Sequence, residues 1–93
     1  RNSLWIGNVR IPQVRSLLLA GLTEMTEKGV ECRLEVLCPV ERAYMELPDL
    51  IRCLGILMDN ALEAALETER PWVEILLLQE EDVLTIRISN PWL

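Results

Sequence analysis

The strongest constraint on the fold is a change from a helical to a strand pattern near residue 70. Before this point, apolar side chains from Pro48 to about Leu66 recur at three- and four-residue spacing, which predicts an amphipathic helix. After it come two segments rich in strand-forming residues, separated by three acidic residues. They predict a β-hairpin with strands at 72–79 and 83–89. A helix and a hairpin that each have one apolar face require a layered fold.

The first half of the chain contains a similar succession of elements. Apolar side chains between residues 14 and 25 share one helical face, a proline suits the first turn, and Lys28-Gly29 suits the end. Residues 30–36 alternate strictly, which predicts a half-buried strand. A short second strand is predicted within Glu41–Leu47. The order of elements predicts an α+β fold, a two-layer sandwich in which helices cover one face of a mostly antiparallel sheet.

Composition limits the chemistry. The 93 residues carry a net charge of -6 and no cluster of Lys or Arg, which argues against binding to nucleic acid or to an anionic membrane surface. No apolar run reaches the roughly 20 residues of a membrane span. Because the sequence has no His, it cannot form a His-dependent catalytic triad. Cys32, Cys38 and Cys53 form no CxxC pair and favour reduced thiols in a cytosolic protein over a zinc site.

A polar residue interrupts the predicted middle helix. Asn60 lies opposite its apolar face, although Asn is a mediocre helix former. Glu63 and Glu67 are neighbours on the same face, and Asp59 lies at its edge. An amide oxygen flanked by acids can bind a hard cation such as Mg²⁺. Periodicity alone leaves an alternative open, in which these residues are the solvated polar face of an ordinary amphipathic helix.

The amino-acid sequence of this predicted helix also resembles that of a known family. The segment DLIRCLGILMDNALEAALE, Asp49 to Glu67, resembles the N-box helix of the GHKL ATPase family, which includes sensor histidine kinases, gyrase, Hsp90 and MutL. Its LMDNALEAA core is most similar to kinases of the quorum-sensing peptide-receptor class. The surrounding order of KGV, LPDL and ISNPW agrees, so the resemblance covers roughly residues 11 to 92. It implies part of a Bergerat fold, with ATP and Mg²⁺ as the cofactors of the intact parent.

The resemblance also implies roles for individual residues. Asn60 matches the family Asn that binds the Mg²⁺ bridging the ATP phosphates. Glu63 matches an acidic position more loosely, and a solvated helix face is its alternative. Asn90 falls where other members carry the Asp that reads the adenine amino group, and its carbonyl oxygen can still accept a hydrogen bond. A turn residue before Pro91 is an equally good interpretation of Asn90.

Two departures from the family pattern shape the prediction. Ile56 stands where many histidine kinases have another Asn and where gyrase-like ATPases have a catalytic Glu, which disfavours gyrase-type ATP hydrolysis. The last of the four glycines is Gly55, whereas family members bind the phosphates with Gly-rich segments that follow the hairpin. We therefore interpret residues 1–93 as a single partial domain, the N-terminal half of an ATP-binding catalytic domain, truncated after the hairpin.

The predicted function is that of a fragment of the ATP-binding domain of a two-component sensor histidine kinase, cytoplasmic in location. The intact parent would transfer the γ-phosphoryl group of ATP to a His. Its partners would be a His-containing dimerisation domain and a response regulator. We expect the fragment itself to bind no nucleotide, to lack kinase activity, and to form a homo-oligomer through residues 83–89 or the region of Trp72 and Trp92. A non-catalytic GHKL-like interaction module and an unrelated small α+β domain are the alternatives.

Overall fold

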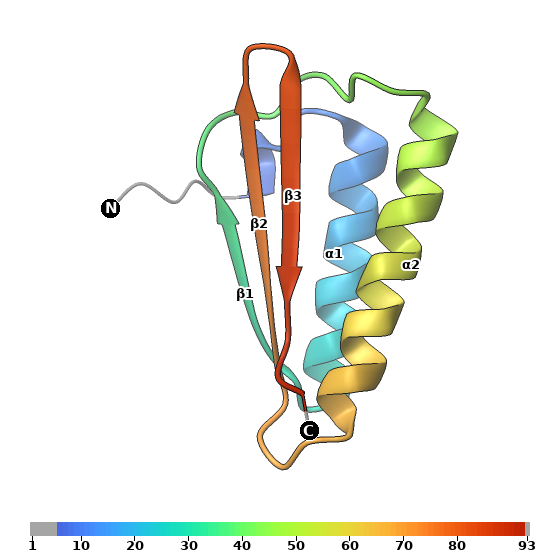
Figure 1. The fold of residues 1–93 in the computed structure, drawn as a ribbon, viewed down its shortest axis with the longest axis vertical. Helices are drawn as coiled ribbons and strands as arrows, with labels where there is room; N and C mark the ends of the chain where they lie inside the picture. The colour runs from blue at the N-terminus through green and yellow to red at the C-terminus, as the bar shows by residue number, and fades with distance from the viewer. Residues whose placement is uncertain (1–5, 93) are drawn as a thin grey trace.

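The structure, a computed structural model, describes residues 6–92 (Figure 1). Over this range, a short 3-10 helix (Ile6–Asn8) precedes two helices and three strands. In chain order these are α1 (Pro12–Glu27), β1 (Glu31–Val36), α2 (Leu47–Leu66), β2 (Trp72–Glu80) and β3 (Val83–Ser89). The strands form a sheet in the order β1-β2-β3.

Both helices lie on the same face of this sheet (Figure 1), which confirms the predicted α+β two-layer sandwich. The sheet is mixed, because β1 pairs with β2 in parallel and β2 pairs with β3 in antiparallel orientation. The parallel pairing follows from α2, which crosses from the end of β1 back to the start of β2. The tight turn between β2 and β3 produces the antiparallel hairpin that the sequence predicts.

The predicted helices form because their ends carry suitable turn residues. Pro12 begins α1, where its missing N–H would have had no helical partner. The N–H of Val30 donates to the carbonyl of Met25 at 2.9 Å and closes the other end. Between them Gly29 has a φ of 79°, a left-handed conformation that glycine adopts without strain. Helix α2 likewise has a proline in its first turn and an acidic residue near its positive end.

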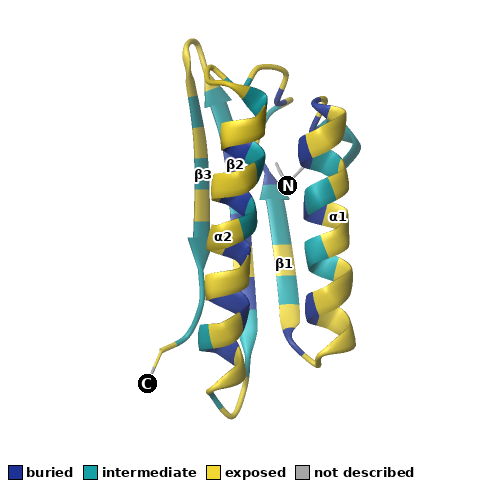
Figure 2. Cartoon of the chain, turned by 90° about the vertical axis from the view of Figure 1, so that its right-hand side faces the viewer, coloured by how far each residue is buried: buried dark blue, intermediate teal, exposed yellow. Residues whose placement is uncertain are grey.

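The core lies between the sheet and the two helices (Figure 2), where α1 contacts β1 and α2 contacts β2 and β3. One stripe of each helix is buried, together with the alternate side chains of β2 that face it, as the sequence predicts. The alternate side chains of β3 are half-buried against the same core. The buried residues of α2 and β2 are Leu50, Leu54, Met58, Ala61, Leu62, Ala65, Val73, Ile75 and Leu77.

The predicted second strand within Glu41–Leu47 is wrong. Residues 41–46 form an irregular loop, and Leu47 already belongs to the first turn of α2. Tyr44 has a φ of 58°, a left-handed conformation that interrupts any extended run. Two of the loop's backbone N–H groups donate to the side chain of Gln79 on β2 instead of to a neighbouring strand. The loop is therefore held by side-chain contacts and not by sheet pairing.

The three cysteines are free thiols, as the sequence predicts: Cys32 and Cys38 are half-buried and Cys53 is exposed. Among residues 6–92, no helix has both the length and the apolar character needed to cross a membrane.

Candidate functional site

Helix α2 presents Asn60 to solvent. The residue is exposed and lies opposite the core-facing side chains Met58, Ala61 and Leu62. Across residues 6–92, nothing forms a hydrogen bond with the Asn60 side chain. An Asn in a helix interior destabilises the helix by less than about 1 kcal/mol relative to Ala, so the fold tolerates the exposed amide. Its oxygen and its N–H groups are therefore free for a ligand.

Acidic side chains surround Asn60. Asp59 precedes it, and Glu63 and Glu67 lie one and two turns further along the same side of α2, all exposed. Within the described part of the chain, no three acidic, Cys or His side chains are arranged to hold a metal ion. A cation at Asn60 would therefore need oxygen ligands from a second source, such as the phosphates of a nucleotide.

Asn90 follows β3 directly and is half-buried. Its Nδ2 donates a hydrogen bond to the carbonyl of Pro91 at 2.8 Å. This bond fixes the orientation of the side-chain amide within the turn. In the part of the chain that the structure describes, no donor reaches Oδ1, which is left as a free acceptor.

Asn60 and Asn90 belong to different elements that end on the same side of the molecule. Helix α2 and strand β3 run in the same direction (Figure 1), so the second half of α2 and the end of β3 lie at one end of the fold. No hydrogen bond joins the two residues within the range 6–92. They thus lie toward the same end of the α2–β3 pair.

An apolar groove lies between the first half of α2 and β3, away from Asn60. Its volume is about 220 Å³. This is below the 300–1,000 Å³ or so of most small-molecule pockets. We call it the α2–β3 groove, and its walls include Ala43, Met45, Leu54, Leu57, Leu84 and Ile86.

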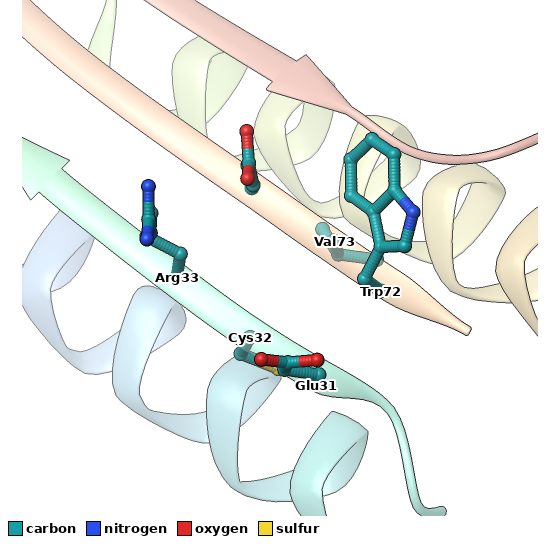
Figure 3. Close-up of a pocket in the computed structure, with 6 residues that line it drawn as sticks. Glu31, Cys32, Arg33, Trp72 and Val73 are labelled. Atoms are coloured by element: carbon teal, nitrogen blue, oxygen red, sulfur yellow. The ribbon is translucent and has the colours of Figure 1, made fainter. Parts of the chain in front are cut away.

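A second hollow lies on the open face of the sheet (Figure 3), across the sheet from both helices. Glu31 and Arg33 of β1 and Trp72 of β2 point into solvent there. Its volume is about 230 Å³, and its rim mixes acidic and basic side chains along neighbouring strands. The hollow is therefore separated from Asn60 by the whole sheet and is no part of the same site.

Sequence reasoning missed one polar residue that organises this fold. Gln79 continues the row of inward-facing side chains on β2 that begins with Val73, Ile75 and Leu77. A polar residue at the end of such a row is the signal that could have identified it, because an inward-facing amide needs partners. Those partners belong to the loop before α2.

A comparison with protein-family models places this arrangement in a known group. The model described as "GHKL domain" matches residues 45–93, more than half of the chain. The matched stretch contains α2 and the hairpin, and so Asn60, Glu63 and Asn90. GHKL domains bind ATP, usually with Mg²⁺. No curated protein matches the chain significantly. Because this match covers more than half of the chain, the chain belongs to the GHKL domain family.

Proposed function

We propose that this chain is part of the ATP-binding catalytic domain of a two-component sensor histidine kinase, closest to the quorum-sensing peptide-receptor class. The observation that carries the proposal is Asn60, an exposed amide without a protein partner in residues 6–92, at the centre of the helix that matches the GHKL family. A residue kept for the fold alone would be a better helix former at this position.

The proposed role of Asn60 is to bind Mg²⁺ through Oδ1. A single neutral amide cannot hold the ion alone, and the chain's net charge of -6 repels a free triphosphate. Both problems are solved when the metal arrives already bound to the nucleotide, because the phosphates supply further oxygens and the ion screens their charge. Glu63 then adds a nearby negative charge that attracts the cation directly or through water.

We propose that Asn90 reads the adenine base. Its free Oδ1 can accept a hydrogen bond from the exocyclic amino group of adenine, while the bond from Nδ2 to Pro91 keeps the amide in that orientation. Guanine presents an oxygen at the same place on the ring. Two acceptors would then face each other, so the locked amide favours adenine nucleotides.

The chemistry that follows is phosphoryl transfer. The proposed nucleophile is a His of a separate dimerisation domain, since this sequence contains none. A response regulator is the proposed next partner, and the cytoplasm is the proposed location. Ile56 lies one turn before Asn60 and can neither bind a metal nor activate water. Such a site contributes by positioning and by charge stabilisation, which suits transfer to a protein side chain more than hydrolysis.

A non-catalytic interaction module is the alternative. The observation in its favour is the exposure of large apolar side chains beside the α2–β3 groove, where Leu57 is 50% exposed and Val83 is 60% exposed. Strand β3 is also an edge strand whose outer backbone groups have no partner strand in residues 6–92. Both features favour contact with a protein, and we propose self-association as the simplest case.

Paramagnetic relaxation separates the two functions. Mn²⁺ would replace Mg²⁺ and be added to the isotopically labelled chain with and without a non-hydrolysable ATP analogue. The kinase proposal predicts nucleotide-dependent broadening centred on Asn60. Asn60→Ala should abolish this broadening, whereas the control Thr23→Ala, on the exposed side of α1, should preserve it. Broadening that is unaffected by Asn60→Ala would refute the metal assignment.

A further inference from the structure

The start of α2 is not fixed by a local cap. Glu46 occupies the position before the helix, and its side chain makes no capping hydrogen bond. Pro48 in the first turn has no N–H, so it forms no hydrogen bond that could link the helix start to the preceding loop. Core packing of Leu50 and Leu54 holds α2 on the sheet. The missing side-chain cap leaves its first turn open to a further influence from the preceding loop.

Gln79 holds that loop with both ends of its side-chain amide. Its Oε1 accepts hydrogen bonds from the N–H of Glu41 at 2.6 Å and of Arg42 at 3.4 Å. Its Nε2 donates to the carbonyl of Arg42 at 3.2 Å. The side chain thus presents to the loop the donor and acceptor that a neighbouring strand would otherwise supply.

Two further contacts tie the loop to the same end of the hairpin. The Cys38 thiol donates to the carbonyl of Gln79 at 2.9 Å, and the N–H of Gln79 donates to Cys38 Sγ at 3.1 Å. The Tyr44 hydroxyl donates to the carbonyl of Glu81. The left-handed backbone at Tyr44 costs energy for a non-glycine residue, which indicates that surrounding contacts enforce it.

We propose that Gln79 is a positioning residue for α2. It acts through the loop of residues 41–46, it fixes where α2 begins and how the helix sits on the sheet, and it sets the wall of the α2–β3 groove that Ala43 and Met45 form. Gln79 touches no ligand in this role. Its effect on Asn60 rests on the proposed function, whereas its effect on the loop and helix does not.

The test is residue-resolved hydrogen exchange on Gln79→Met, which keeps the size of the side chain and removes its polar atoms. The matched control is Gln13→Met, the same change at an exposed position of α1. We expect the amides of Glu41 and Arg42 to exchange about tenfold faster in Gln79→Met, which corresponds to about 1.4 kcal/mol. Amides in the first turns of α2 should follow, while those of α1 keep their protection. The side-chain amide resonance of Asn60 should also shift in Gln79→Met and not in the control.

Two outcomes would overturn the proposal: unchanged exchange in the loop, or equally faster exchange throughout the core, which is the mark of a merely structural role. Gln79→Glu provides a rescue test, because a carboxylate still accepts from both N–H groups and should keep them protected. Equal losses in Gln79→Glu and Gln79→Met would refute the acceptor role. If Gln79→Met fails to fold, Tyr44→Phe serves as the second variant. Faster hydrogen exchange confined to the loop would support the proposal, and unchanged exchange in the loop would contradict it. Asn60→Ala should leave hydrogen exchange in the loop unchanged. A failure of the proposed nucleotide site can therefore be distinguished from a failure of the Gln79 proposal.

Discussion

A glycine-to-alanine comparison tests the packing of the two helices most sharply. Gly21 lies inside α1 and Gly55 inside α2. A Cβ atom at Gly21 would lie 1.9 Å from Met58 Cε and 3.4 Å from Met58 Sδ. A Cβ atom at Gly55 would meet nothing within 4 Å. At Gly21 the substitution therefore requires the end of the Met58 side chain to move, whereas at Gly55 it requires no movement.

The expected free energies of unfolding follow from two effects. Alanine in place of a helical glycine stabilises by roughly 0.5–1 kcal/mol. At Gly21 the clash forces Met58, only 3% exposed, to repack inside the core. Such overpacking costs about 1–3 kcal/mol. A flexible thioether should keep the cost toward the lower end. Gly55→Ala should thus stabilise by about 1 kcal/mol, and Gly21→Ala should be less stable than Gly55→Ala by about 1–3 kcal/mol.

Urea unfolding followed by circular dichroism measures both values, and a double-mutant cycle assigns the cause. Met58→Leu removes the clashing Cε at a cost below about 1.5 kcal/mol. In that background Gly21→Ala should stabilise the chain as Gly55→Ala does. Equal stabilisation by the two alanines in the wild-type background would refute the close approach of α1 and α2 at Gly21.

Three further predictions concern other parts of the molecule. Burial raises the pKa of the Cys32 thiol above its ordinary 9.0, and a hydrogen bond with Thr26 partly offsets this. Because the folded state holds this proton more tightly, the contribution of Cys32 to the free energy of unfolding is lost as pH rises from 9.0 through the raised pKa. An alkylating reagent near pH 8 should therefore modify the exposed Cys53 before Cys32. Asn90→Asp should retain any preference for ATP over GTP, measured by competition, whereas Asn90→Leu should lose it, and an equal preference in all three proteins would contradict adenine recognition. Sedimentation at tens of micromolar should show a dimer or larger assembly through edge strand β3, and a monomer would exclude it.

The secondary structure was predictable because its signals are local. The helix of residues 12–27 and the hairpin strands follow from periodicity and from turn residues such as Gly29. The parallel pairing of β1 with β2 was less visible, because an alternating strand pattern fixes neither partner nor direction. The loop of residues 41–46 reads as strand-like, yet its conformation depends on Gln79, far along the chain.

Less of the candidate site than of the secondary structure could be predicted from the sequence pattern. The exposure of Asn60 follows from helical periodicity, and the structure agrees with it. Its ligand rests on the family resemblance, because one exposed amide does not specify a metal. The free acceptor of Asn90 could not be predicted, since the hydrogen bond to Pro91 that defines it depends on the local backbone geometry.

The most direct test of the account is a titration of this chain with Mg²⁺ and a non-hydrolysable ATP analogue, followed by calorimetry and by residue-resolved NMR. Residues 56–93 contain no glycine, so they offer no Gly-rich loop that could donate backbone N–H groups to the phosphates. Losing several charge-assisted hydrogen bonds of about 1.5–3 kcal/mol each weakens binding by several orders of magnitude. We predict no measurable heat at micromolar concentrations, and Mg²⁺-dependent shifts confined to Asn60, Asn90 and their neighbours at the highest nucleotide concentrations. A dissociation constant in the low micromolar range, or shifts that leave Asn60 unaffected, would contradict the account.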